Sequence, residues 1–298
     1  MNETRKEIKK VGIISNNQNL KAITTAKEIY DYLTSKGCRI YLLGEDIVSQ
    51  QYSLEGCSGK EFSSQVDLII SVGGDGTFLR AARYSFDREI PVMGINVGNL
   101  GFLAEIDTTS MYDYIEKALH GNFMIEKRML IEGKIIKKGE GKSNEGFPFL
   151  ALNEFSIVKS ALDKIIRIKI VVNKNDVASY SADGIIISTP TGSTAYSLSA
   201  GGPVVEPTNR VIVVTPICPH TFFNRSLVLN QDDQLEIELE SKNESMILST
   251  DGVKSSSNLF SGDIFKVRKS AKSLNLITFD KHAFFKIFRE KLLSKRNF

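Results

Sequence analysis

The chain of 298 residues contains few of the side chains that disulfide or metal chemistry needs. Its three cysteines, Cys38, Cys57 and Cys218, are an odd number without a CxxC spacing, which excludes a disulfide framework and a cysteine zinc site. Its three histidines lie far apart along the sequence, so they form no visible metal-ligand cluster. This cysteine usage is typical of a protein in a reducing cytoplasm, where we expect it.

Long apolar runs and a strong charge of one sign are also missing. The amino terminus lacks the apolar run of a signal peptide, and no stretch approaches the roughly 20 apolar residues of a membrane-spanning helix. The formal net charge of +3 does not indicate a nucleic-acid partner. Six Lys or Arg against one Glu lie in Lys281–Phe298, which we interpret as a solvated helix face rather than a membrane or nucleic-acid arm.

What is present is the composition of a globular protein, 42% hydrophobic and 24% charged, and the length favours about two domains. Strand and helix patterns alternate over the first 121 residues, which predicts an α/β domain with a Rossmann-like parallel sheet. The strand patterns are Val11–Ser15, Arg39–Leu43, Val66–Val72 and Pro91–Ile95, and the helical ones are residues 20–33, 77–86 and 111–119. Gly37 stands where the first of these helices should end.

Residues 122–279 show a different pattern, in which strand-like runs follow one another with little helical spacing. They predict an all-β, sandwich-like second domain. Helical spacing returns in residues 280–298, which we expect to form a carboxyl-terminal helix that packs back on the first domain. The strand-like runs are Met129–Lys137, Phe149–Val158, Ile165–Asn173, Val177–Ser188, Arg210–Thr215, Gln234–Glu240 and Ser245–Ser249.

Glycine is clustered: ten of the 22 lie either between Gly73 and Gly101 or between Gly184 and Gly202. The segment Gly73–Thr77 (GGDGT) follows a buried-looking strand and precedes a helix. Backbone amides of such a loop, which contains Gly73, Gly74, Gly76 and Thr77, together with the helix amino terminus, can bind a phosphate. No lysine follows as in GxxxxGK[ST], so a bound polyphosphate would need Mg²⁺ to neutralise its charge.

Asp75 is the one carboxylate inside this loop, and two functions suit it. It could accept a proton from an attacking hydroxyl or hold Mg²⁺. The alternative is an Asp that fills a tight turn or caps the helix, as Thr77 could. Arg80, one turn into the helix, could reach a phosphate or be a solvated helix residue. The glycine segment Gly94–Leu103 is either a second wall of the same crevice or an ordinary tight loop.

Two later segments carry polar groups that suit a nucleoside. Asn153 and Glu154 are adjacent in an apolar strand and point to opposite faces, so at least one should face the interior or a cleft, unless they mark a strand end or bulge. Seven of the twelve residues in Ser188–Ser199 are Ser or Thr, and Tyr196 could stack on a base. The alternative for this stretch is a polar loop that leads into a short helix.

In this order, the segments Gly73–Thr77, Asn96–Leu103, Asn153-Glu154 and Asp183–Pro203 resemble the NAD kinase family. GGDGT alone is shared with diacylglycerol- and sphingosine-type lipid kinases, but the Thr189–Pro203 stretch is far more specific. The resemblance implies an α/β domain, a β-sandwich-like domain and a nucleotide crevice between them. It also implies transfer of a terminal phosphoryl group from ATP or polyphosphate to the 2′-hydroxyl of the adenosine ribose of NAD, which gives NADP.

The same resemblance implies roles for individual residues. Asp75 would accept the 2′-hydroxyl proton, and the Gly76 backbone would contact the dinucleotide. Mg²⁺ or another divalent cation would accompany the donor, and the protein would form a homodimer or homotetramer. The other residues implied to bind substrate are Asn153, Glu154 and Asp183 for ribose and base groups, Thr194, Ala195, Tyr196, Ser197, Leu198 and Ser199 for the adenosine pocket, and Arg80 and Lys164 as further ligand contacts.

Ser181 and Val253 depart from the pattern of many bacterial relatives, which carry Arg and Gln there, so the sequence leaves the preference for NAD or NADH open. Two other functions also stay open. A lipid kinase could use the same GGDGT loop with a deep apolar acceptor pocket, although Thr189–Ser199 offers mainly hydroxyls. A dinucleotide sensor could bind without turnover, with a purely structural Asp75.

Overall fold

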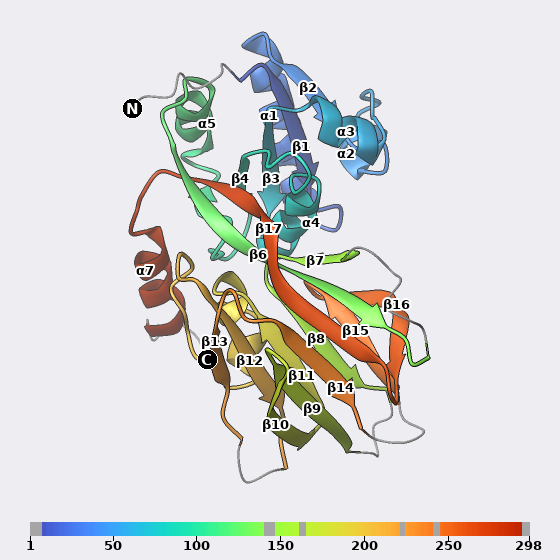
Figure 1. Cartoon of the computed structure of the whole chain (residues 1–298). Helices are drawn as coiled ribbons and strands as arrows, with labels where there is room; N and C mark the ends of the chain where they lie inside the picture. Colours follow the sequence, from blue (N-terminus) through green and yellow to red (C-terminus); the bar gives the residue numbers. More distant parts are fainter. Residues whose placement is uncertain (1–7, 140–146, 161–164, 221–223, 241–244, 294–298) are drawn as a thin grey trace. The chain divides into compact units, whose positions relative to one another are not determined.

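The computed structural model describes residues 8–139, 147–160, 165–220, 224–240 and 245–293. The chain forms two compact units. One contains the described residues up to Lys127 and those from Leu274 onward, and the other is Arg128–Ser273. The chain passes between the units twice, in the strands β6 (Met124–Ile136) and β17 (Ile264–Thr278) (Figure 1).

The first unit is built on a parallel sheet with the strand order β2-β1-β3-β4, to which β5 is added beside β4. β3 (LIISVG) is buried along its whole length, as expected for a parallel strand covered on both faces. The register pairs Ser15 with Val72 and Gly73 with Asn96, so three loops leave the sheet at one edge. The strands are β1 (Lys10–Ser15), β2 (Arg39–Leu42), β3 (Leu68–Gly73), β4 (Val92–Asn96) and β5 (Ile106–Asp107).

Helices connect these strands, and residues at both ends of the longest helix explain where it begins and ends. The Asn19 side chain caps its amino end by accepting from the amide of Ala22 at 3.2 Å, and Gly37 follows its carboxyl end with a φ of +79°. This confirms the predicted terminal glycine, because L side chains rarely adopt that backbone conformation. The helices are α1 (Leu20–Ser35), α2 (Ile47–Gln51), α3 (Gly59–Gln65), α4 (Asp75–Arg83) and α5 (Met111–Leu119).

The residues after β17 complete the first unit. The helix α7 (Ala283–Phe288) and the π-helical turn η2 (Arg289–Leu293) follow. The Phe284 ring lies against Phe102 with the ring centroids 6.0 Å apart, and Phe279 lies against Tyr114 at 4.6 Å. Leu276 pairs with Val92 of β4, so the end of β17 extends the sheet of this unit.

The second unit is a sandwich of two antiparallel sheets, as the sequence predicts. In one sheet β10-β9-β14-β17 are neighbours and β6 and β7 pair beside them, and the other has the order β13-β12-β11-β8-β15-β16. The further elements are β7 (Phe149–Ala151), β8 (Glu154–Lys159), β9 (Ile166–Val172), β10 (Asn175–Ala182), β11 (Gly184–Ser188), η1 (Thr191–Thr194), α6 (Tyr196–Ser199), β12 (Val211–Ile217), β13 (Leu227–Asn230), β14 (Leu235–Leu239), β15 (Ser245–Thr250) and β16 (Val253–Phe260).

The core of the sandwich lies between its two sheets. Ile166, Ile168 and Ile170 of β9 belong to the same buried cluster as Ile185 and Ile187 of β11. These residues alternate along their strands, so one face of each strand points into the core. Within the described part of the chain, no helix is long and apolar enough to cross a membrane.

Two of the strand-like runs are each divided into two strands by a polar residue. Asn153, together with Leu152, separates β7 from β8, and Asp183 separates β10 from β11. In both cases the two strands belong to different sheets, so each polar residue stands where the chain crosses from one sheet to the other. β13, β16 and β17 are additions to the predicted pattern.

Candidate functional site

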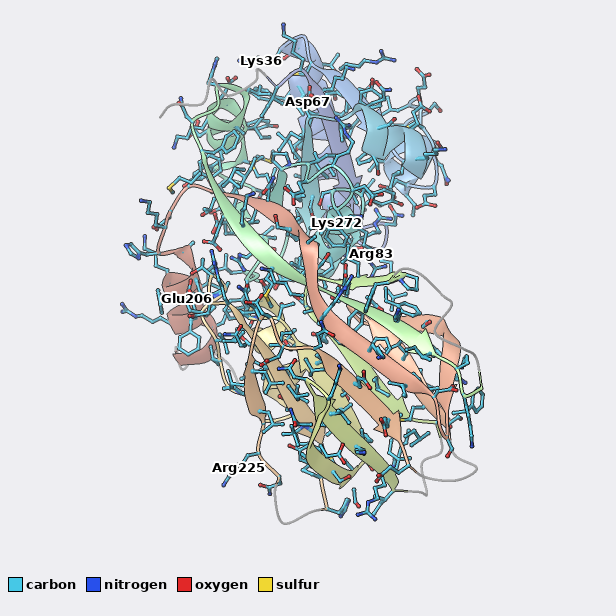
Figure 2. All side chains as sticks on the ribbon, in the orientation of Figure 1. Lys36, Asp67, Arg83, Glu206, Arg225 and Lys272 are labelled. Atoms are coloured by element: carbon cyan, nitrogen blue, oxygen red, sulfur yellow. The ribbon has the colours of Figure 1, made fainter. Side chains whose placement is uncertain are left out.

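The GGDGT loop connects β3 to α4 at the carboxyl edge of the parallel sheet. Gly73 has a φ of +156°, and a Cβ built on it would lie 2.4 Å from the Thr77 Oγ1, so only glycine fits there. A Cβ on Gly74 or Gly76 would meet no atom within 4 Å, so both glycines face open space. Asp67, labelled in Figure 2, lies before β3 at the opposite edge.

Asp75 begins α4, and its half-buried carboxylate is bound by the second glycine segment. Oδ2 accepts from the amide of Phe102 at 2.9 Å, and Oδ1 accepts from the amides of Leu103 at 3.0 Å and Ala104 at 3.3 Å. A Cβ on Gly101 would lie 2.0 Å from Oδ1, so this approach requires glycine. The two glycine segments are therefore joined through Asp75.

These bonds fix the Asp75 carboxylate without filling its capacity to accept hydrogen bonds. A carboxylate accepts about four bonds, and three amides bind it here. Oδ2, which accepts from Phe102 alone in these contacts, can take one more donor. The carboxylate is thus held in one orientation while an acceptor site is left for a hydroxyl or a cation.

A cleft of about 420 Å³ lies beside the GGDGT loop. Gly74, Gly76 and Thr77 form one part of its lining, and Ser15–Gln18, the residues at the end of β1 and after it, form another. The sequence interpretation missed Asn16, Asn17 and Gln18. The available signal was their place after a strand that, like β3, ends at the carboxyl edge, where open α/β sheets bind ligands.

Arg80 lines the same cleft and is held there by an ion pair. Its Nη2 lies 2.7 Å from the Oδ1 of Asp46 and donates to the Ser15 carbonyl at 2.8 Å. Asp46 is only 1% exposed, and burial raises its pKa although the Arg80 charge opposes that shift. Arg80 is therefore a fixed cation of the cleft wall rather than a freely solvated helix residue.

In the second unit, the turn at Asp251 organises the segment at Asn153. Its carboxylate accepts from the amides of Leu152 at 3.0 Å, Asn153 at 2.7 Å and Glu154 at 3.2 Å. Asp251 itself has a φ of +47° at the start of the turn between β15 and β16. The sequence interpretation gave Asp251 no role, although an Asp-Gly pair between strand-like runs already indicates a constrained turn.

Asn153 and Glu154 carry buried polar atoms that point to a ligand. Glu154 is 5% exposed, and burial together with the nearby Asp251 charge raises its pKa to about 8. Within the described residues, the Oε2 of Glu154 and the Oδ1 of Asn153 have no hydrogen-bond partner. Because buried polar atoms almost always have partners, these two are candidates for bonds to a bound molecule.

The Ser/Thr-rich segment folds against Asn153 and uses many of its hydroxyls internally. Thr189 Oγ1 donates to the Leu152 carbonyl at 2.6 Å, and Ser193 Oγ donates to the Pro190 carbonyl at 2.7 Å. A Cβ on Gly192 would lie 2.1 Å from the Asn153 carbonyl oxygen, so the two backbones touch. Most of the predicted pocket residues of the segment are half-buried or exposed, namely Thr194, Ala195, Tyr196, Leu198 and Ser199, whereas Ser197 is buried.

Asp183 does not lie beside Asn153 and Glu154. The antiparallel pairing places Gly184 opposite Val158 and Ser188 opposite Glu154, so Asp183 lies at the far end of the strand pair. Four residues of strand correspond to about 13 Å. There Asp183 pairs with the Lys159 ammonium at 2.6 Å. Lys164 lies outside the described residues.

No group of three or more His, Cys, Asp or Glu side chains that could hold a metal occurs in the portion of the chain that the structure covers. The GGDGT loop contributes one carboxylate, that of Asp75. Mg²⁺ is commonly bound by one or two carboxylates together with waters and substrate phosphates. A single carboxylate of this kind fits a cation whose other ligands are waters and phosphate oxygens.

Comparison with known proteins agrees with this arrangement. Residues 11–123 match the family model of the ATP-NAD kinase N-terminal domain, and residues 152–279 match that of the ATP-NAD kinase C-terminal domain. NAD kinase of Caldanaerobacter subterraneus subsp. tengcongensis is 40% identical over 290 residues, which are 97% of this chain and 100% of that protein. NAD kinase of Thermoanaerobacter sp. strain X514 is 39% identical over 289 residues, with the same coverage.

Two solved structures are similar to the chain. Yeast NADH kinase, crystallised with NADH, has a TM-score of 0.89 at 23% identity over 99% of this chain and 90% of its own, which shows the shared fold. An NAD kinase from Archaeoglobus fulgidus in complex with ATP has a TM-score of 0.70 at 26% identity over 94% and 96% of the two chains. The fold and the phosphate-type loop are thus those of a two-domain phosphotransferase. The chain belongs to the NAD kinase family.

Proposed function

We propose that the protein transfers the terminal phosphoryl group of ATP, or of polyphosphate, to the 2′-hydroxyl of the adenosine ribose of NAD and thereby makes NADP. The observation that carries the proposal is the fixed Asp75 carboxylate. Three backbone amides hold it, and the two glycines on either side of Asp75 in the sequence line a cleft. Membership of the NAD kinase family supports the choice of dinucleotide as acceptor.

In the proposed reaction, the ribose oxygen forms a bond to the terminal phosphorus as the bond from that phosphorus to the bridging oxygen breaks. The hydroxyl proton passes to Oδ2 of Asp75, and the shortened donor leaves. The open glycines and the amino end of α4 would stabilise the phosphate charge. Mg²⁺ or another divalent cation bound with the donor would supply further charge neutralisation.

In the second unit, Asn153 and Glu154 are the proposed contacts to the dinucleotide. Glu154, with its raised pKa, is largely protonated at neutral pH and can donate a hydrogen bond as well as accept one. Asn153 offers a buried carbonyl oxygen to a ribose hydroxyl or a base amino group. Thr194 to Ser199 are proposed to line the adenosine pocket, with the exposed Tyr196 ring available for stacking.

The test is to incubate the purified chain with NAD, ATP and Mg²⁺ and to detect NADP. We expect NADP from the wild type and a fall in kcat of about a hundredfold or more for Asp75→Asn, because a positioned proton acceptor contributes roughly that much. Asp67→Asn, a change of carboxylate at the opposite edge of the same sheet, is the matched control. No NADP from the wild type, or full activity of Asp75→Asn, would rule out the proposal.

Two further measurements, of diacylglycerol phosphorylation and of nucleotide binding, separate the two other functions. Phosphorylation of diacylglycerol without phosphorylation of NAD would identify a lipid kinase. Nucleotide binding without any turnover would identify a sensor. Crossing ATP, other nucleoside triphosphates and polyphosphate with NAD and NADH would define the donor and the redox form. A homodimer or homotetramer and a cytoplasmic location stay predictions.

A further inference from the structure

We propose that the carboxyl-terminal segment from Thr278 to Lys291 is a positioning element for Asp75, which acts through the loop that binds the carboxylate. This inference rests on the proposed function of Asp75. It concerns residues of the first unit alone, and the sequence interpretation assigned none of the residues of the carboxyl-terminal segment to the site. The contacts that carry it bracket the three amide donors of Phe102, Leu103 and Ala104.

On one side of the donors, α7 contacts Phe102. The Phe284 ring lies against the Phe102 ring at 6.0 Å between centroids with an interplanar angle of 38°. The Lys291 ammonium, about two turns further on, lies 4.9 Å from the centroid of the same ring, which is within the range of a cation–π contact. Phe102 is therefore held by two side chains from the carboxyl-terminal segment, and its own amide donates to Asp75.

On the other side, Glu105 directly follows the last donor, Ala104. Its Oε1 accepts from the hydroxyl of Thr278, the last residue of β17, at 2.9 Å. Thr278 is 4% exposed and Glu105 is half-buried, so this hydrogen bond is partly shielded from solvent. The loop from Phe102 to Glu105 is thus tied at both ends to a segment more than 170 residues away in sequence.

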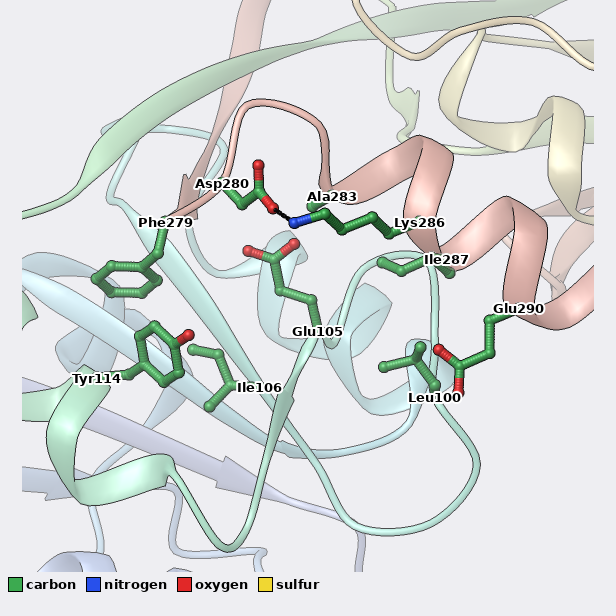
Figure 3. A pocket seen from close by; sticks show the side chains of 10 residues that line it. All are labelled: Leu100, Glu105, Ile106, Tyr114, Phe279, Asp280, Ala283, Lys286, Ile287 and Glu290. Carbon is green, nitrogen blue, oxygen red and sulfur yellow. Dashed lines mark hydrogen bonds and ion pairs between the residues drawn. The ribbon is translucent and has the colours of Figure 1, made fainter.

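A cavity lies beside the loop, next to these two ties. A cavity of about 220 Å³ is lined by Leu100 of the glycine loop, by Glu105 and by Ile287 of α7, as Figure 3 shows. Leu103 and Ala104 are themselves buried and do not line the cavity, so Phe284, Lys291 and Thr278 support the two ends of the loop, Phe102 and Glu105. Loss of one of them would let the amides shift and the Asp75 carboxylate move with them.

The experiment compares kcat and KM for NAD in the full chain carrying Phe284→Ala, Phe284→Leu or Phe285→Ala. We expect Phe284→Ala to lower kcat about ten- to a hundredfold, because small misplacements of a reacting group have effects of that size, with KM changed less than about twofold. Phe284→Leu, which restores an apolar contact, should recover most of the loss. Phe285 lies on the same helix, is 57% exposed and contacts the Phe284 ring but leaves the Phe284–Phe102 contact in place, so Phe285→Ala should lower kcat much less than Phe284→Ala.

A double-variant cycle tests the route through Phe102. If Phe284 acts on that ring, the Phe102→Ala and Phe284→Ala changes together should cost no more in kcat than the larger single change. Unchanged kcat in Phe284→Ala, a parallel rise in KM, or additive losses would overturn the inference. Thr278→Val, which deletes one hydroxyl, decides the matter if Phe284→Ala does not fold: it should lower kcat at constant KM. If the wild type forms no NADP, the proposed function itself is refuted. If the wild type is active and the variants are equally active, only the present inference is refuted.

Discussion

Asp251 accepts the backbone amide of Glu154 at 3.2 Å, and its negative charge at the same time helps to keep the Glu154 side chain protonated. One carboxylate thus fixes the backbone of a second acidic residue and tunes its proton affinity. A mainly protonated Glu154 can offer a hydrogen to a ligand oxygen, which an ionised glutamate cannot do.

The first prediction concerns stability against pH. The pKa of Glu154 is raised from 4.5 to about 8 in the folded chain, so the folded state binds more protons than the unfolded state between these values. The protonated Glu154 carboxyl therefore makes its full contribution to the free energy of unfolding below about pH 4.5. As the pH rises to about 8 this contribution is lost, and the free energy of unfolding falls by up to about 5 kcal/mol. Urea unfolding of the wild type and of Glu154→Gln across this range measures it.

The Gln variant is the reference, because its amide does not titrate and its volume is the same. We expect the difference in unfolding free energy between the two proteins to shrink or reverse as the pH rises. Parallel curves for the two proteins would contradict the raised pKa of Glu154.

Asp251→Asn should separate the two effects of Asp251. Asparagine tolerates the positive φ of this position, so the turn is kept. The amide side chain accepts through one oxygen only, so we expect a loss of about 1–3 kcal/mol of unfolding free energy. Removal of the charge should also lower the pKa of Glu154. Urea titrations should show the pH-dependent loss of stability ending at a lower pH than in the wild type. Asp232→Asn, on an exposed turn, is the control and should change neither quantity.

Arg80→Ala should destabilise the first unit. It leaves the buried Asp46 carboxylate without its cation, and the loss of one partner of such a pair costs about 3–5 kcal/mol. Because protonation can neutralise Asp46, the loss should be smaller at pH 5 than at pH 7. Chemical denaturation at both pH values measures this. Arg83→Ala, an exposed arginine of the same helix (labelled in Figure 2), should have little effect. An Asp46→Asn background should remove most of the Arg80 effect, and equal losses in both backgrounds would refute the coupling.

Gly101→Ala should impair turnover more than folding. A Cβ at this position would lie 2.0 Å from Oδ1 of Asp75, so the carboxylate must move. We expect kcat to fall about a hundredfold, as for other small misplacements of a reacting group. Gly44→Ala serves as control, because its Cβ would meet nothing closer than 3.7 Å. NADP formation by both variants, with their melting temperatures, checks this, and normal turnover by Gly101→Ala would show that the carboxylate needs no fixed position.

Much of the first unit could be predicted because its signals are local. The buried run of β3, the periodicity of α1 and Gly37 after it each follow from adjacent residues. The short helices α2 and α3 were not predicted, since five and seven residues are too few to show an amphipathic repeat.

The site was predicted by residue type more than by arrangement. Sequence reasoning found Asp75 and Glu154, but not the amides that hold Asp75 or the part of Asp251 in holding Glu154. These contacts join residues 27 and 97 positions apart, and only the register of the folded sheets brings them together. Asp183 illustrates the converse: it belongs to a resembling motif, yet strand pairing puts it at the other end of β11.

The chain crosses to the sandwich in β6 and comes back in β17, and this order has a consequence for biosynthesis. On the ribosome, all five strands of the parallel sheet emerge first, but Leu276 and α7, which complete the first unit, are made after the whole sandwich. The sandwich has all its strands, apart from the last part of β17, before the first-made unit can close. We therefore expect nascent chains that stop short of Leu274 to contain a folded sandwich and a first unit that lacks the Leu276 pairing and α7.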